Sequence, residues 1–433
     1  MSTASSATAE SAREASRHEG YRSGEPGYRR IAVALFAAGV GTFALLYSTQ
    51  ALLPELAHGF SVSAAASTLS LSLTTAGLGV SLLVAGAVSE LVGRTRLIHL
   101  SLFASAVIGV ACALAPGWDA LLGLRLLQGI ALAGLPATAT AYLREELHAG
   151  TYARAAGLYV GGTALGGMSG RLIVGAVAEI AGWRWALAAI AGLGLVCAAV
   201  VMVTLPASRN FAPAPASIGH LAAMTRRAVC DRALLALYAV GACSMGAFVT
   251  VYNAIGFRLT SAPFHLSVGA AGLVFLVYPV GTLSSAVAGR MAERFSRRAV
   301  VPVGCVIACA GVLVTLPGSL APITGGLAVM TAGFFVVHGV ASGWVPARAH
   351  LGGVPSGQAA SLYLFAYYLG SSVFGSVSGH AWTLGAWPAV AALALLLLVV
   401  SGLLTAWLRH IPALDTGTPV NGISPPVWPR SSR

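Results

Sequence analysis

Long apolar runs alternate with short polar segments along almost the whole chain. Twelve runs are long enough, at about 20 residues each, to cross the roughly 30 Å hydrocarbon core of a bilayer as α-helices. Residues 1–30 are rich in Ser, Ala, Glu and Arg and predict a disordered tail. The pattern therefore predicts an all-α membrane protein. We place the spans near residues 31–54, 66–89, 97–116, 119–142, 155–181, 184–205, 232–257, 268–290, 299–317, 321–345, 357–381 and 385–408.

Composition supports the membrane prediction. Apolar residues make up 57% of the chain and charged residues only 9%, and a soluble protein of 433 residues could not cover its surface with so few charges. All 25 basic residues are Arg, and the net charge is +12. These arginines are spread over short segments between the spans, so no basic patch on a soluble face predicts nucleic-acid binding.

The placement of arginine predicts the orientation. If the N-terminus is cytoplasmic, that side of the membrane receives 21 arginines and the opposite side receives only Arg184 and Arg258. Cytoplasmic loops carry such an excess in multi-pass proteins. We therefore expect a plasma (inner) membrane protein with both termini in the cytoplasm.

Nine positions in the first half of the chain recur in the second half at an offset of 203 or 204 residues. They are Gly86, Glu90, Arg94, Arg144, Leu158, Tyr159, Gly166, Gly175 and Trp183, which return as Gly289, Glu293, Arg297, Arg348, Leu362, Tyr363, Gly370, Gly379 and Trp387. An even number of spans per unit makes the repeats parallel. We expect a six-helix bundle at 31–205, a cytoplasmic linker at 206–231, a second six-helix bundle at 232–408 and a cytoplasmic tail at 409–433.

A polar motif lies in each repeat between its second and third spans. It comprises Gly86, Glu90, Gly93 and Arg94 in the first copy and Gly289, Glu293, Arg297 and Arg298 in the second. This motif and the duplication resemble the major facilitator superfamily (MFS). The resemblance implies twelve transmembrane helices in two parallel six-helix repeats, the MFS fold, with a cytoplasmic gate at the motif. The alternative is that these arginines only set the topology.

Two arginines fall inside spans, where a guanidinium costs at least about 2.5 kcal/mol and marks a functional residue by default. Arg125 and Gln128 match the family element Arg-x-x-Gln-Gly, and the resemblance implies a role in proton coupling. The alternative is that Arg125 snorkels to the membrane surface near Asp119. Arg171 lies near the middle of the Gly-rich fifth span, and we expect it to face a central cavity.

The remaining polar candidates occur in spans 1, 7, 10 and 11. They are Tyr47, Gln50, Tyr252, Asn253, His338, Tyr363 and Tyr367. Together they predict an aromatic, weakly polar pocket, although each tyrosine is equally compatible with simple packing. His338 is the imidazole deepest within a span, so it is a candidate for carrying a proton or for a structural role.

Several segments, among them 46–54 and 166–171, are similar to the YnfM-type branch of the superfamily, whose members are known as drug or sugar efflux proteins. The resemblance implies proton-coupled efflux of a small organic compound by alternating access. The two membrane arginines favour a second hypothesis, which is uptake or exchange of an organic anion or sugar. The expected partners are a small-molecule substrate, protons and the lipid bilayer, and we expect a monomer.

The sequence lacks the motifs that mark other classes of function. No phosphate-binding loop, Gly-x-Ser-x-Gly or His-Glu-x-x-His segment occurs, so we expect neither ATP-driven transport nor an enzyme, and no cofactor or metal. A receptor or scaffold would be expected to carry a large soluble domain, which the spacing of the spans does not provide.

Overall fold

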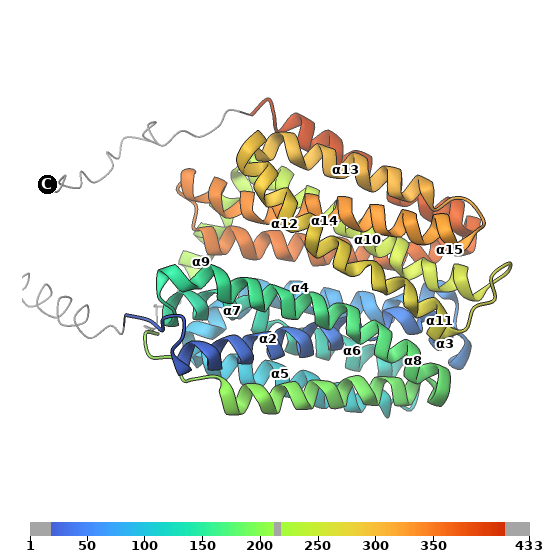
Figure 1. Cartoon of the computed structure of the whole chain (residues 1–433), viewed down its shortest axis with the longest axis horizontal. Helices are drawn as coiled ribbons and strands as arrows, with labels where there is room; N and C mark the ends of the chain where they lie inside the picture. The colour runs from blue at the N-terminus through green and yellow to red at the C-terminus, as the bar shows by residue number, and fades with distance from the viewer. Residues whose placement is uncertain (1–18, 212–217, 412–433) are drawn as a thin grey trace, which may run out of the picture.

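Two bundles of helices lie side by side in the computed structural model, which describes residues 19–211 and 218–411 (Figure 1). The first half contains α2 (Pro26–Tyr47), η1 (Gln50–Leu52), α3 (Leu53–Gly59), α4 (Ala64–Val92), α5 (Arg94–Ala113), α6 (Trp118–Leu132), α7 (Gly134–Glu146) and α8 (Ala149–Thr204). The second half contains α10 (Arg232–Thr260), α11 (Val268–Gly272), η2 (Leu273–Val277), α12 (Tyr278–Phe295), α13 (Arg297–Val314), α14 (Leu320–Leu351) and α15 (Ser356–Trp407), and α9 (Ile218–Cys230) connects the halves.

The two ends of the molecule differ. The described chain begins and ends at the left end in Figure 1, which we call the terminal face. The opposite end, where α3 and α11 lie, is called the distal face. The placement of arginine along the sequence predicts that the terminal face lies in the cytoplasm.

The expectation of twelve spans is confirmed. Ten helices within the described ranges are long and apolar enough to cross a bilayer, but two of them have 56 and 52 residues. A straight helix of 56 residues would be about 84 Å long, far more than a bilayer needs. Each long helix turns back on itself where the backbone leaves helical geometry, at Gly182 in α8 and at Gly385 and Ala386 in α15.

Side-chain caps determine where several helices begin. Ser63 accepts a hydrogen bond from the backbone N–H of Ala66 at the start of α4. Asp231 accepts from the first turn of α10, and Ser267 caps α11. These oxygens replace acceptors that the first turn of a helix lacks, and Pro26 starts α2 at a position that needs no donor.

The start of the chain differs from the expected disordered tail of residues 1–30, because its last part is ordered. Residues 1–18 lie outside the described ranges, but α2 already begins at Pro26. The backbone N–H of Tyr21 donates to the carbonyl of Glu146, and His148 N–H donates back to Tyr21. This pairing with the turn between α7 and α8 supplies the backbone partners that order the segment.

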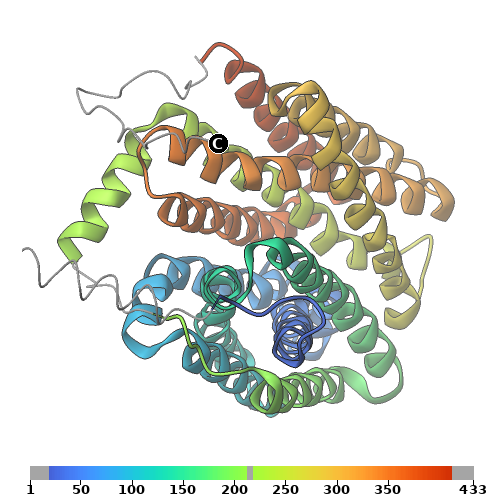
Figure 2. The ribbon, with the colours of Figure 1, turned by 60° about the vertical axis from the view of Figure 1, so that its left-hand side comes forward.

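The expected linker also contains structure. Glu146 accepts hydrogen bonds from the backbone N–H groups of Arg209 and Asn210, which fasten the start of the connection to the first half. Helix α9 packs on the second half, where Gln358 donates to Thr225 over 2.8 Å. Figure 2 shows α9 leading into α10 at the terminal face. The end of the chain from residue 412 lies outside the described ranges.

Glycine brings α8 against α2 in the first half. A Cβ atom at Gly162 would lie 2.5 Å from the carbonyl oxygen of Phe36, and one at Gly166 would lie 2.3 Å from that of Val40. Gly170 makes the same approach one turn later. Without a hydrophobic force between helices in lipid, such close backbone packing is a main source of attraction.

Equivalent positions of the two repeats make equivalent contacts. Gly370, the counterpart of Gly166, contacts the backbone of Ala242 in α10. The two arginines nearest the distal face cap the third span of each half. Arg184 donates to the carbonyls of Ala113 and Ala115 and stacks on Trp183, whereas Arg258 donates to those of Thr315, Leu316 and Pro317 and stacks on Trp387. Arg184 and Arg258 are thus exceptions to the arginine bias because they donate hydrogen bonds to the carbonyl groups left without partners at helix ends.

We expect Gly166→Ala to lower the free energy of unfolding by about 1–3 kcal/mol, because the added methyl group collides with the α2 backbone. Gly161→Ala is the matched control, since a Cβ there meets no atom within 4 Å. Thermal unfolding of the purified protein in detergent measures both. Equal melting temperatures for the two variants would contradict the packing described here.

The turns of the duplicated motif share one backbone conformation that favours glycine. Gly93 has φ 93° and ψ 147°, and its counterpart Ser296 has φ 86° and ψ 147°. Residues other than glycine rarely adopt this backbone conformation, because it costs them about 1–3 kcal/mol of strain. Ser296 therefore carries strain that Gly93 does not.

Ser296→Gly is accordingly expected to stabilise the protein by about 1 kcal/mol, and Gly93→Ser to destabilise it by a similar or larger amount. Midpoints of thermal unfolding provide the comparison. A stabilising effect of Gly93→Ser would show that the first turn does not need a glycine.

Candidate functional site

Along α8 the two halves meet near the distal face, whereas α4 and α15 stay in contact as far along as Gly79 and Tyr368. A Cβ at Gly379 in α15 would lie 2.5 Å from Ala65 in α4, and Gly175 in α8 packs on Gly269 in α11. Glu179 accepts a hydrogen bond of 3.0 Å from the backbone N–H of Gly269. Nearer the terminal face, a Cβ at Gly161 would meet no atom within 4 Å. The contact between the halves therefore weakens along α8 toward the terminal face.

Arg171 lies where the halves begin to touch. Its side chain is 1% exposed, and Nε donates to Oε1 of Gln50 over 2.6 Å while Nη1 donates to the carbonyl of Gly167. Its guanidinium carbon lies 4.1 Å from the ring centre of Tyr47 and 4.7 Å from that of Tyr278. Among the described residues no carboxylate contacts this cation.

A chain of amide hydrogen bonds continues from Arg171 into the second half. Gln50 Nε2 donates to Oδ1 of Asn253 over 2.8 Å, and Asn253 Nδ2 donates to the carbonyl of Gly375 over 3.3 Å. Three of the predicted site residues thus form one connected unit across the interface. The break between α2 and η1 places Gln50 there.

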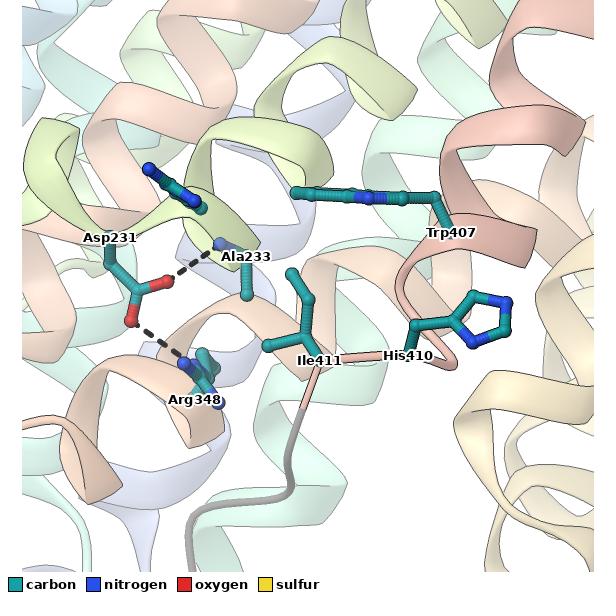
Figure 3. Close-up of a pocket in the computed structure, with 7 residues that line it drawn as sticks. Asp231, Ala233, Arg348, Trp407, His410 and Ile411 are labelled. Carbon is teal, nitrogen blue, oxygen red and sulfur yellow. Dashed lines mark hydrogen bonds and ion pairs between the residues drawn. The ribbon is translucent and has the colours of Figure 1, made fainter.

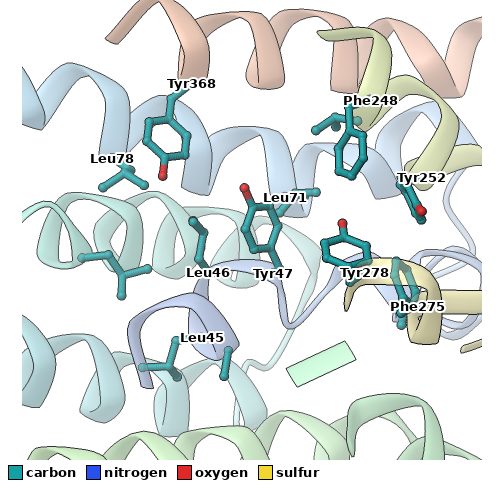
Figure 4. Close-up of a cluster of buried hydrophobic side chains, with 14 of the residues drawn as sticks. Leu45, Leu46, Tyr47, Leu71, Leu78, Phe248, Tyr252, Phe275, Tyr278 and Tyr368 are labelled. Carbon is teal, nitrogen blue, oxygen red and sulfur yellow. The ribbon is translucent and has the colours of Figure 1, made fainter. Parts of the chain in front are cut away.

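Aromatic rings surround this unit on the side of the second half. Tyr252 packs on Phe248, Phe275 and Tyr278, and its hydroxyl group bonds with Thr331 at 2.7 Å. Figure 4 shows the hydroxyl groups of Tyr47 and Tyr278 pointing the same way. Sequence reasoning missed Phe275 and Tyr278. Their only signal was an aromatic pair three residues apart, which is also typical of core packing.

His338 belongs to a second aromatic group between α14 and α15. Its Nδ1 lies 3.0 Å from the hydroxyl oxygen of Tyr363, and its ring centre lies 4.6 Å from that of Tyr367. Tyr367 also contacts Tyr368, whose ring lies above Leu78 in Figure 4. The predicted pocket residues of spans 10 and 11 therefore come together within the second half.

Arg125 is buried inside the first half, away from the interface between the halves. It donates to the carbonyls of Leu45 and Leu46 at the end of α2 and to that of Ser70 in α4. It also donates to Gln128 over 2.5 Å, and Gln128 donates to the carbonyl of Ser105 in α5. All its acceptors among the described residues are uncharged, so Arg125 joins helices and caps the broken first span. The structure does not place it at the membrane surface, as snorkelling would require.

The first copy of the motif forms an ion-pair cluster within the first half. Arg94 lies 2.5 Å from Glu90 and 3.1 Å from Glu145 at the end of α7, and it also donates to Ser89. The conformation of Gly93 at the turn allows α5 to begin with Arg94. A Cβ at Gly86 would meet no atom within 4 Å.

The second copy is arranged differently. Glu293 and Arg297 are exposed, and Arg298 bonds with the backbone of Arg409. Like Gly86, Gly289 faces open space. The gate between the halves therefore stays a prediction.

A cavity of about 500 Å³ opens on the terminal face of the second half (Figure 3). Asp231 lies at its wall, where it accepts from Arg348 over 3.1 Å and from the N–H of Ala233. Trp407 and His410 form the opposite wall. This cavity is separate from the Arg171 unit.

Comparison with known proteins identifies the family. The sequence profile of the Major Facilitator Superfamily matches residues 31–281. The chain belongs to the major facilitator superfamily. It is 43% identical over 378 residues to the inner membrane transport protein YnfM of Escherichia coli, which covers 87% of this chain and 90% of that protein. It is 39% identical to the uncharacterized MFS-type transporter YybF of Bacillus subtilis over 90% of this chain and 96% of that one.

Solved structures of transporters share the MFS fold. A bacterial homolog of the human lysosomal transporter Spinster superposes with a TM-score of 0.71 at 16% identity, over 89% of this chain and 98% of that one. The nucleoside transporter NupG gives 0.67 at 15% identity, over 88% and 99%. The MFS membership confirms the predictions of a multi-pass transporter and of a protein that is not an enzyme.

We expect Arg125→Leu to cost about 3 kcal/mol of stability or more, because several buried carbonyl oxygens lose their donor. Arg154→Leu is the control, since Arg154 is exposed on α8. Thermal unfolding in detergent distinguishes the variants. Equal stability combined with lost transport for Arg125→Leu would contradict a structural role.

Proposed function

We propose that this protein is a secondary active transporter of the inner membrane that exports a small organic compound in exchange for protons by alternating access. The observation that carries the proposal is the asymmetry of the contact between the halves along α8. The halves are joined near the distal face by the Arg171–Gln50–Asn253 unit, while α8 is free of such contacts near the terminal face. Rocking of two rigid halves would reverse this pattern and expose the site to the other side.

The substrate would bind between the halves, beside Arg171 and the surrounding aromatic rings. Tyr47 belongs to the first half and Tyr278 to the second, so a molecule bound beside Arg171 would contact both halves. His338 is the candidate residue for proton coupling, because it is an imidazole within a span that bonds to Tyr363 in the second half. In the same cycle, Glu90 and Arg94 would join Glu293 and Arg297 in closing the terminal face.

One observation favours a second candidate, uptake or exchange of an organic anion or sugar. Arg171 is a buried cation that no carboxylate neutralises within the described ranges. An uncompensated buried charge favours an anionic ligand and disfavours a cationic one. The direction of transport and the charge of the substrate can be tested in one experiment.

We expect a neutral or cationic solute to collapse the pH gradient of energised everted vesicles that contain the wild-type protein, followed with an acridine dye. Arg171→Ala is expected to abolish this response and Arg154→Ala to preserve it. A response only to anions, or solute flux without proton movement, would favour the second candidate over proton-coupled export.

A further inference from the structure

We propose that Arg171 and Tyr278 form a carboxylate-binding site, and that a carboxylate bound there displaces Gln50 from Arg171 and loosens the distal contact. The ligand class is a small organic acid with an aromatic or apolar body. The inference rests on the proposed transport function and develops its second candidate, the organic anion, because it assigns an anionic substrate class and a coupling step to the same site.

The guanidinium of Arg171 has donors to spare. Of its five N–H groups, Nε donates to Gln50 and Nη1 to the carbonyl of Gly167, whereas Nη2 donates to no described residue. Both acceptors are neutral. A carboxylate would take Nε from Gln50 together with the free Nη2 donor and supply the missing negative charge. Charge-assisted hydrogen bonds are roughly twice as strong as neutral ones, so the exchange of acceptors is favourable.

Tyr278 adds a donor from the second half. Its hydroxyl group is buried and has no hydrogen-bond partner in the described structure. Its ring lies against the Arg171 guanidinium, and its hydroxyl points to the same side as that of Tyr47 (Figure 4). A carboxylate has two oxygens, and Arg171 and Tyr278 can each serve one of them.

The rings around Arg171 indicate the body of the ligand. Tyr47 and Phe275 lie within 4.1 Å and 5.1 Å of the guanidinium carbon, measured to their ring centres. Aromatic rings offer faces and edges for an aromatic or apolar group but few acceptors for a strongly polar one. A hydrophobic organic acid therefore fits these surroundings better than a sugar.

The amide chain links this site to the distal contact. Arg171 only donates, so it orients the oxygen of Gln50 toward itself, and the nitrogen of Gln50 then faces the oxygen of Asn253. Asn253 is oriented in turn by its donation to Gly375. When a carboxylate replaces Gln50 as acceptor, Gln50 loses the bond that fixes its orientation across the interface. A ligand shifts the two conformations only through such a difference in contacts.

The first experiment measures binding to the purified full-length protein with benzoate as the probe and benzamide as its neutral analogue. Ligand-induced shifts of the unfolding temperature report affinity. We expect benzoate to bind roughly ten-fold more tightly than benzamide. Tyr278→Phe keeps the ring and is expected to remove most of this preference.

Tyr238→Phe is the matched control, because it also removes a buried tyrosine hydroxyl group without a partner, at a site far from Arg171. It should keep the preference for benzoate. Arg171→Lys retains the charge but lacks the planar, forked donors that pair with both oxygens of a carboxylate, and we expect it to weaken benzoate binding as well. Equal affinity for benzoate and benzamide, or no binding of benzoate at millimolar concentrations, would overturn the proposal.

The second experiment follows the distal face directly. Spin labels at Ile180→Cys and Ser261→Cys, both exposed positions on opposite halves, are placed in a chain without its six native cysteines. Benzoate is expected to lengthen the distance between the labels and benzamide to leave it unchanged. With Asn253→Ala the distance should be long without ligand. No effect of benzoate on the distance overturns the coupling.

These results are separable from those for transport. Benzoate binding and distal opening without proton-linked flux in vesicles would contradict the exporter function while supporting the site. Proton-linked flux of solutes without any carboxylate preference would support the exporter and overturn the site.

Discussion

A bilayer supplies no hydrogen-bond partners, so each break in a spanning helix must find its partners inside the protein. The break after Tyr47 in the first span illustrates the constraint. Arg125 holds the carbonyls at the end of α2, and this arrangement frees Gln50 to point across the interface. The site between the halves therefore depends on a buried arginine that does not itself contact the second half among the described residues.

The same requirement explains the arginines at the distal face. Arg184 and Arg258 each satisfy the carbonyls at the end of a third span while a tryptophan covers the guanidinium. Such caps, together with the glycine contacts of α8 on α2, stabilise each half as a unit. Two stiff halves that meet at a polar interface are compatible with the rocking that the proposed alternating access requires.

The interface between the halves combines close backbone packing with few hydrogen bonds. Close glycine contacts near Gly379 and Gly175 allow the backbones to meet, and few hydrogen bonds hold them together. Arg171 adds a buried charge whose neighbours are rings and neutral oxygens. Separating the halves at Arg171 would break no ion pair among the described residues, which lowers the cost of opening the interface there.

The sequence alone established the twelve spans, the parallel repeats and the list of candidate residues. These features follow from hydropathy, periodicity and the duplicated motif, which depend on local composition and on spacing along the chain. Tertiary structure decided which candidates meet. Arg125 and Arg171 look alike as membrane arginines in the sequence, yet one caps a helix and the other lies between the halves. Tyr278 joined the candidate site only through its contact with Arg171. Those outcomes depend on helix rotation and on breaks in the spans, which arise from packing between segments far apart in the chain.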